Sequence, residues 1–204
     1  MVLDNMIVFE GLDGAGTTTQ NKLLKERFEQ NGKTVFLTHE PTDNPIGRVV
    51  RQVLQHKFET TMEALALLYS ADRHDHLYNK EYGIEKHIEN GEIVLADRYF
   101  YSSIAYQGVE CSAEYIKKIN DYPNPRYVIF IDTPVDNCIN RIEKRGEEKE
   151  LFDRAEYLEK VRTNYLEQFK NLGEETKLLI VDGTKSIEEV HQEIISWLKS
   201  YFTL

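Results

Sequence analysis

Short apolar runs alternate with longer amphipathic segments along most of the chain. Five runs consist almost entirely of apolar and β-branched residues, at positions 7–9, 34–37, 93–96, 127–131 and 178–181. Unbroken apolar strands of this length suit a parallel sheet that is covered on both faces, because strands with one solvated face alternate apolar and polar positions. The pattern therefore predicts five buried strands.

The segments between these runs carry the periodicity of amphipathic helices. The predicted helices span positions 17–31, 46–56, 61–90, 98–107, 112–121, 134–145, 152–171 and 186–202. Strands that alternate with helices indicate βαβ units, and so an α/β fold with a parallel sheet. No repeat or linker-like stretch divides the 204 residues, which fit a single domain spanning 1–204. Ligands of such sheets lie beyond the carboxyl ends of the strands, so the residues that follow each strand are the candidates for chemistry.

A glycine-rich segment follows the first strand and precedes a helix, which is the setting of a phosphate-binding loop. Glycines bring backbone N–H groups close to phosphate oxygens, and the helix N-terminus adds its dipole. Thr18 stands where such loops carry their magnesium-binding hydroxyl. A tight turn without a ligand is the alternative. The residues expected to bind a nucleoside triphosphate are Gly11, Leu12, Asp13, Gly14, Ala15, Gly16, Thr17, Thr18 and Thr19.

One position departs from the phosphate-loop pattern. The motif has Lys directly before the hydroxyl residue, and this chain has Thr17. The lysine would make a charge-assisted contact to the phosphates, and removing one preorganised donor from an active site costs on the order of 3 kcal/mol of transition-state stabilisation. Either another cation replaces it, or the protein is a slow kinase or no kinase. Lys22, one helical turn further on, is expected to point away from the phosphates.

Residues 97–108 follow the third strand and read Asp-Arg-Tyr-Phe-Tyr-Ser-Ser-Ile-Ala-Tyr-Gln-Gly. This segment resembles the signature of the thymidylate kinase family. Glu-Pro-Thr at 40–42, Tyr-Ser-Ala-Asp-Arg at 69–73 and a charged segment at 145–153 occur in the family's order. The resemblance covers essentially the whole chain. It implies the P-loop kinase fold, with five parallel strands, helices on both faces and a small lid at about 143–153, and transfer of the γ-phosphoryl group of ATP to dTMP.

The resemblance also implies a set of acceptor contacts. Asp13 would accept a hydrogen bond from the 3′-hydroxyl, Tyr69 would stack on thymine, and Arg73 would reach the base or the phosphate. Tyr69 and Arg73 are four positions apart on a predicted helix and so share a face. His39 stands where the family commonly has Arg. Tyr106 is expected beside C2′, where its bulk disfavours a ribose hydroxyl. The residues expected to contact dTMP are Asp13, Glu40, Tyr69, Arg73, Arg98, Ser103, Tyr106 and Gln107.

On the donor side, the resemblance implies that Asp97 and Thr18 hold Mg²⁺ and that Arg98 bridges the phosphates of the two substrates. Arg141 and the loop formed by Asp182, Gly183 and Thr184 would border the adenine.

Members of the family carry a finger-like basic residue in the phosphate loop or in the lid. Gly14 and Ala15 are not basic, so Arg145 of the lid is the expected finger. Lys149 is the expected replacement for the missing loop lysine, a hypothesis that rests only on its proximity in the sequence.

Charge and cysteine content narrow the possible partners and the compartment. The net charge of −10 disfavours a nucleic-acid partner, because the surface repels a polyphosphate backbone. No apolar stretch reaches the length of a membrane span. The N-terminus lacks the features of a secretory leader, and two isolated cysteines, Cys111 and Cys138, suit a reducing compartment. We expect a cytoplasmic protein, and the resemblance implies a homodimer.

Several of these side chains also have a purely structural explanation. Tyr69 could be a core residue, and Arg73 could be a solvated surface residue. Asp97 and Arg98 could form a structural ion pair, and the charged run after position 145 could be a solvated loop.

Two further functions stay open. One is another phosphotransferase of the same fold, acting on a deoxynucleoside or a different monophosphate. The other is a nucleotide-binding protein that has lost catalysis, for which Thr17 is the sole support in the sequence.

Overall fold

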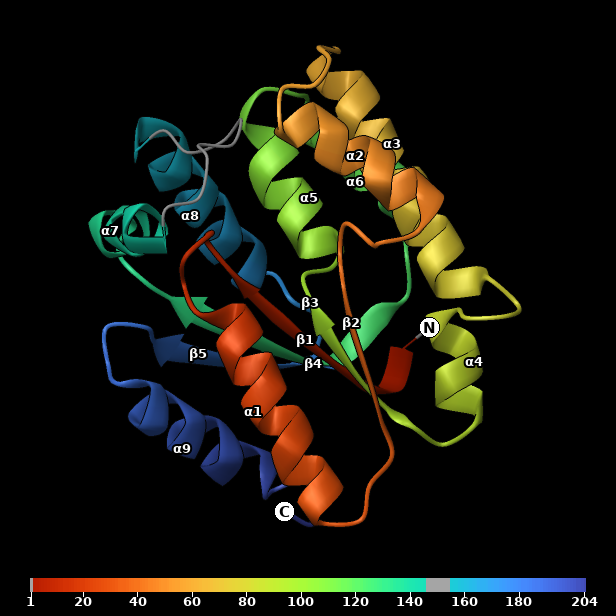
Figure 1. Cartoon of the computed structure of the whole chain (residues 1–204), viewed down its shortest axis with the longest axis vertical. Coiled ribbons are helices and arrows are strands. Elements are labelled where there is room, and N and C mark those ends of the chain that lie inside the picture. The colour runs from red at the N-terminus through yellow and green to blue at the C-terminus, as the bar shows by residue number, and fades with distance from the viewer. Residues whose placement is uncertain (1, 146–154) are drawn as a thin grey trace.

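The computed structural model describes residues 2–145 and 155–204 and has a five-stranded sheet at its centre (Figure 1). All strand pairs are parallel, which confirms the predicted α/β fold. The first strand is longer than predicted, because its N-terminal residues pair with the start of β4. The strands are β1 (Val2–Gly11), β2 (Val35–His39), β3 (Ile93–Asp97), β4 (Asn124–Asp132) and β5 (Lys177–Asp182).

The strand order β2-β3-β1-β4-β5 places the first strand in the middle of the sheet. The chain builds one half of the sheet with β2 and β3 and then crosses to the other side of β1 for β4 and β5. This reversal creates a topological switch point at the carboxyl end of β1, where ligands of open α/β sheets bind. The glycine-rich segment predicted to hold phosphates begins at that end.

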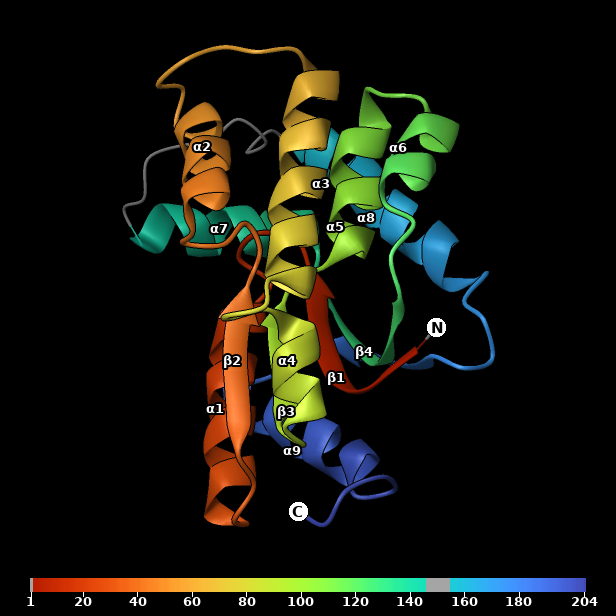
Figure 2. The same ribbon diagram turned by 90° about the vertical axis from the view of Figure 1, so that its right-hand side faces the viewer.

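Helices cover both faces of the sheet and extend beyond its carboxyl edge (Figures 1 and 2). α1 packs on β1, β2 and β3 and also contacts α9, whereas α4 and α5 contact β1. None of the helices in the described residues combines the length and apolar character needed to cross a membrane. The helices are α1 (Thr17–Gln30), α2 (Pro45–Leu54), α3 (Met62–Tyr78), α4 (Ile84–Glu89), α5 (Phe100–Tyr106), α6 (Ala113–Ile119), α7 (Val135–Arg145), α8 (Ala155–Phe169) and α9 (Ile187–Leu198), with a 3-10 turn η1 (Gln107–Val109).

The single helix predicted over 61–90 is wrong, because the chain forms α3 and α4 with a break between them. The side chain of Asn79 accepts a hydrogen bond from the N–H of Glu81 at 2.9 Å, which forms a local turn. Gly83 then approaches the backbone of Asn79 so closely that a Cβ there would lie 2.5 Å from its carbonyl oxygen. These two residues are the turn signals that end α3.

The helix predicted to begin at position 98 begins instead at Phe100. The N–H of Arg98 donates to the carbonyl of Phe9 at 2.9 Å, so β1 still engages the backbone at this point. Arg98 has a φ of 75°, in the left-handed region, and Tyr99 is extended. A non-glycine residue is uncommon in that region and often marks a functional position.

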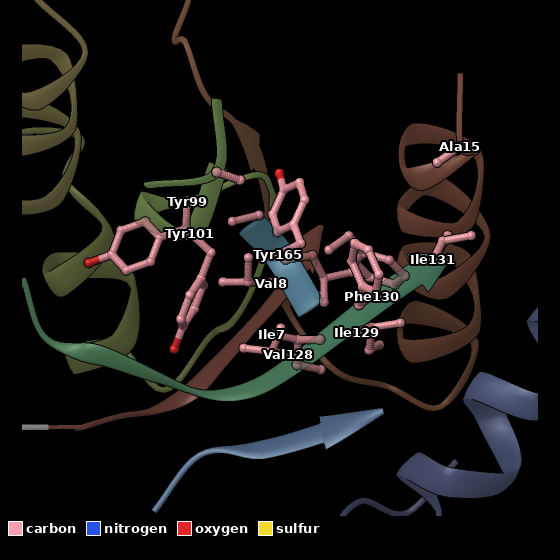
Figure 3. Close-up of a cluster of buried hydrophobic side chains, with 14 of the residues drawn as sticks. Ile7, Val8, Ala15, Tyr99, Tyr101, Val128, Ile129, Phe130, Ile131 and Tyr165 are labelled. Atoms are coloured by element: carbon pink, nitrogen blue, oxygen red, sulfur yellow. The ribbon is translucent and has the colours of Figure 1, made fainter. Parts of the chain in front are cut away.

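The core lies along β1 and β4 (Figure 3). Ile7, Val8 and Ile129 are completely buried, as expected for central parallel strands. Tyr165 of α8 is also completely buried and stacks with Phe169 of the same helix. Both rings also pack against Phe130 of β4, with ring centres 5.1 Å apart, and this contact anchors α8 to the sheet.

The segment between β2 and α2 is held by a close backbone contact. Asp72 of α3 accepts hydrogen bonds from the N–H of Thr42 at 2.8 Å and from its hydroxyl at 2.6 Å. On the other side, Gly47 of α2 lies against the backbone of Thr42, where a Cβ would stand 2.1 Å from the carbonyl oxygen. No side chain fits between them, so this contact sets the position of α2.

We predict that Gly47→Ala destabilises the protein. Alanine normally favours a helix, but here its Cβ would force α2 away from Thr42, and we expect a loss of about 1–3 kcal/mol. Gly173→Ala is the matched control, because nothing lies near its Cβ position, and it should change stability by about 0.5 kcal/mol or less. Urea unfolding of both variants gives the measurement. Equal stability of the two variants would contradict the proposed contact.

Candidate active site

Two cavities meet at the carboxyl edge of the sheet. The first has a volume of about 690 Å³ and the second about 1020 Å³. Four side chains line both of them: Asp13, Thr18, Asp97 and Arg98. A group passed from one cavity to the other would cross this boundary, so the arrangement suits transfer between two bound substrates.

The first cavity contains the complete set of side chains predicted for the acceptor. Asp13, Glu40, Tyr69, Arg73, Arg98, Ser103, Tyr106 and Gln107 all line it. They come from the phosphate loop, the end of β2, α3, the β3–α5 junction, α5 and η1, so the sequence alone did not show that they converge. Lys22 also lines this cavity and not the second one, which places it on the acceptor side.

The second cavity surrounds the glycine-rich loop. Residues 12–19 line it together with Arg141, as predicted for the triphosphate side. Gly11 does not line it, and its carbonyl accepts a hydrogen bond from Arg98 at 2.8 Å. Asp182 and Thr184 are also outside the lining, because they bond to each other; Gly183 and Lys185 line the cavity instead.

Arg98 occupies the boundary between the cavities. Its Nη2 donates to Asp13 Oδ1 at 2.6 Å, and its guanidinium lies 5.2 Å from the ring centre of Tyr106. The hydroxyl of Tyr106 donates to Asp13 Oδ2 at 3.0 Å. The reading of Asp97 and Arg98 as an ion pair with each other therefore does not hold, since each binds elsewhere.

Glu10 lies behind Arg98, and the sequence reading missed it. This carboxylate is completely buried at the end of β1 and accepts hydrogen bonds from Ser102, Tyr165 and the N–H of Tyr99. Burial raises the pKa of Glu10 to about 7, although Arg98 and these donors act in the opposite direction. A signal was present in the sequence, since a carboxylate is out of place in an apolar central strand.

Arg73 is not the solvated surface residue that one reading of the sequence allowed. Its guanidinium is buried and donates from Nε to Glu40 Oε2 at 2.7 Å and from Nη2 to Ser103 Oγ at 3.1 Å. His76 adds a contact to Glu40 Oε1 at 3.1 Å. Burial alone would raise the pKa of Glu40, but Arg73 and His76 lower it below its ordinary value.

Thr18 and Asp97 meet as a magnesium site requires. Thr18 Oγ1 donates to Asp97 Oδ2 at 2.5 Å, and Asp97 Oδ1 is buried with no hydrogen-bond partner among the described residues. An unpartnered buried carboxylate oxygen beside a hydroxyl fits a hard cation. The described residues contain no group of three or more His, Cys, Asp and Glu side chains arranged for a metal. Two protein ligands are nevertheless sufficient for Mg²⁺, which keeps several waters and binds substrate phosphates.

Thr17 does not take the place of a lysine. Its side chain is buried, and its methyl group would lie 3.2 Å from a Cβ on Gly11, so it packs against the end of β1. The cationic side chains that line the loop cavity come from other elements. Among the described residues these are Arg98, Arg141, Lys144 and Lys185.

Arg51 of α2 lines the acceptor cavity and was also missed. Its Nη2 donates to the carbonyl of Pro41 and lies 3.5 Å from Asp43, while its Nε has no hydrogen-bond partner among the described residues. Gly47, Arg51 and Leu54 follow helical spacing on one face of α2. The signal available in the sequence was one arginine at a position where helical spacing places it on the same face of α2 as Gly47 and Leu54.

Some predicted residues cannot be placed. The backbone of Arg145 ends α7, but its side chain and residues 146–154, including Lys149, lie outside the described part of the chain.

Comparison with known proteins gives a consistent result. Residues 9–194 match the family model of thymidylate kinase. A protein of Treponema pallidum described as a thymidylate kinase is 39% identical, over 98% of this chain and 97% of its own length. A Pyrococcus abyssi protein with the same description is 41% identical, over 95% of both chains. One from Methanocaldococcus jannaschii is 39% identical over 98% of both. Because the family match and the identities extend over nearly the whole length, the chain belongs to the thymidylate kinase family.

Proposed function

We propose that this protein transfers the γ-phosphoryl group of ATP to dTMP, giving ADP and dTDP, and that it does so without a lysine in the phosphate loop. The supporting observation is the boundary between the two cavities, where Asp13, Thr18, Asp97 and Arg98 face both of them. In-line phosphoryl transfer requires positioned substrates and positive charge around the transferred group, and little covalent chemistry from the protein.

The first cavity suits a deoxynucleoside monophosphate. Tyr69 offers an aromatic face to the base, and Arg73, fixed by Glu40, places a guanidinium in the lining of the same cavity. Arg51 and Arg98 supply cations for the acceptor phosphate. Tyr106 is held against Asp13, so its ring limits the space beside the sugar.

The second cavity suits ATP. The loop backbone and the N-terminus of α1 face the phosphates, and Arg141 is fixed at the adenine side by hydrogen bonds to the carbonyls of Gly14, Ala15 and Gly183. Thr18 and Asp97 would hold Mg²⁺, which neutralises phosphate charge when it is bound. Arg98 faces the point where the transferred group develops charge, and closure of the lid would exclude water.

A cation from the lid region would replace the missing loop lysine. Arg141 is engaged with three carbonyls, and Lys185 pairs with Glu193 at 2.7 Å. Lys144, at the end of α7, lines the cavity and has no ion-pair partner among the described residues. It stands next to Arg145 and close in sequence to Lys149, the two cations proposed for the lid.

We further propose that the protein is a cytoplasmic homodimer. The support is the family resemblance and, for the dimer, Leu67, an apolar side chain of α3 that is half exposed in the single chain. Light scattering after gel filtration measures the mass directly.

We predict ADP formation from ATP that depends on both dTMP and Mg²⁺, and an increase of kcat in Thr17→Lys. Because one preorganised donor is worth on the order of 3 kcal/mol, the gain should not exceed about 100-fold. Thr163→Lys, on the exposed side of α8, controls for added charge and should leave kcat unchanged. A coupled ADP assay gives the measurement. Turnover with thymidine or another monophosphate in place of dTMP would contradict the assigned acceptor.

Arg73→Met should destabilise the protein by about 3–5 kcal/mol, because it leaves Glu40 buried without its partner. Glu40→Gln added to this variant should restore part of the loss. The pKa of Glu40 is below its ordinary 4.5 in the folded state, so its contribution is present above that value and is lost as the pH falls through the folded pKa. Urea unfolding of both variants at pH 7 measures the loss of stability in Arg73→Met and its partial recovery when Glu40→Gln is added. Equal stability of the two variants would refute the pairing.

Alanine substitution at Lys149 should lower kcat as much as substitution at Arg145. Both cations are assigned to the transferred phosphates, so each loss should cost roughly 100-fold or more. Lys144→Ala tests the third lysine of the region in the same assay. If Lys149→Ala turns over normally while Lys144→Ala does not, the replacement cation is Lys144.

A further inference from the structure

Glu10 is the only carboxylate in the apolar core of β1, and none of the roles assigned above uses it. It lies next to Gly11, in register with Phe130 of β4, and none of its surface is exposed. A buried ionised carboxylate is expensive unless it is well hydrogen-bonded. Glu10 lies one residue before the loop and directly behind the cavity boundary. The hydrogen bonds that offset the free-energy cost of burying its charge are therefore made with residues next to the active site.

Two hydroxyl groups link Glu10 to Arg98. Ser102 Oγ donates to Glu10 Oε2 at 2.6 Å, and Tyr165 OH donates to the same oxygen at 2.8 Å. Both hydroxyl oxygens also accept hydrogen bonds from Nη1 of Arg98, at 3.0 Å for Ser102 and 3.2 Å for Tyr165. Glu10 and Arg98 therefore have no direct hydrogen bond but share both intermediates.

The charge of Glu10 fixes the direction of these hydrogen bonds. A hydroxyl has one proton and two lone pairs. The oxygens of Ser102 and Tyr165 also lie within hydrogen-bond distance of each other, at 2.7 Å. While the carboxylate takes a proton from this hydroxyl pair, lone pairs of the pair remain directed at Arg98. A protonated Glu10 becomes a donor itself and competes with Arg98 for those lone pairs. The polarity of the network thus depends on one buried proton.

Arg98 needs such external support. Its backbone is left-handed at φ 75°, between the end of β3 and the start of α5, so no regular element directs its side chain. Two further contacts, to Asp13 and to the carbonyl of Gly11, belong to the glycine-rich loop, and a third, at 3.5 Å, is to the hydroxyl of Tyr106. The contact to Tyr165 attaches it instead to the buried cluster shown in Figure 3, and the contact to Ser102 attaches it to α5.

We propose that Glu10 is the positioning residue for Arg98, holding the guanidinium at the boundary of the two substrate cavities through Ser102 and Tyr165. This inference rests on the proposed function, in which Arg98 contacts the transferred phosphoryl group. Tyr165 from α8, Arg98 from the β3–α5 junction and Tyr99, through its N–H, are the titratable residues that bond to Glu10 or to its hydroxyl partners. Tyr101 of α5 is nearby: burial raises its pKa, and the Glu10 charge adds to that effect.

A pH dependence follows from this arrangement. Burial raises the pKa of Glu10 to about 7, so the ionised form that orients the hydroxyls is lost as the pH falls through 7. Arg98 stays charged throughout. The kcat of the wild-type protein should therefore decrease on the acid side of neutrality, whereas the KM for ATP should change little, because the loop amides that bind ATP do not depend on Glu10.

The test is the pH profile of kcat and KM for Glu10→Gln, Ser102→Ala and Tyr165→Phe. Glu10→Gln should lower kcat at pH 8 by roughly tenfold, the size expected for hydrogen bonds to a charged group, and should abolish the decrease near pH 7. The two hydroxyl variants should each lower kcat by a few-fold. Tyr101→Phe is the matched control, because it removes a buried tyrosine hydroxyl of α5 that is not among the groups bonded to Glu10 or Arg98, and it should leave the profile unchanged.

A second readout does not require turnover. The guanidinium NMR signal of Arg98, assigned by its loss in Arg98→Lys, should titrate near pH 7 in the wild-type protein and not in Glu10→Gln. A folded Glu10→Gln with normal kcat and an unchanged pH profile would overturn the proposal, as would an Arg98 signal that does not titrate. If Glu10→Gln does not fold, normal kcat in the Ser102→Ala/Tyr165→Phe variant overturns it. Absence of wild-type turnover with dTMP, together with a titrating Arg98 signal, would instead refute the proposed function.

Discussion

The position of β1 at the centre of the sheet is the constraint on which the rest of the structure depends. Parallel strands on both sides and helices on both faces remove its backbone and side chains from water. A strand buried in this way ends where the chain reaches solvent, and a loop must follow it there. The end of β1 is also the point where the sheet topology reverses, so the adjoining glycine-rich loop opens into both cavities.

The polar residues of the site are supported by this rigid centre in different ways. Arg73 is fixed by a buried carboxylate from the end of β2, and Arg98 is fixed through hydroxyls that converge on the end of β1. An acidic partner compensates for the burial of each guanidinium, Glu40 for Arg73 and Asp13 for Arg98. The net acidity of the chain is therefore compatible with an anion-binding site, since the cations are concentrated where the strands end.

The absence of a lysine from the loop changes where positive charge must come from. Thr17 fills the space beneath the loop with its methyl group, and Thr18 still reaches Asp97. Arg98, Arg141, Lys144 and Lys185 already line the same cavity, so positive charge reaches it from elements other than the loop.

The sequence by itself determined the strands, the phosphate loop and the family, because apolar runs, glycine spacing and the segment from Asp97 to Gly108 are local patterns. Tertiary structure decided the rest. The left-handed Arg98 depends on a contact with the distant backbone of Phe9, which periodicity cannot reveal. The break at Asn79 comes from local turn residues, which the helical periodicity masks. Glu10 and Arg51 gain their roles only when β1, α2 and α8 come together. The role of a buried charged side chain depends on the groups that contact it, and their separation along the chain does not predict which groups these are.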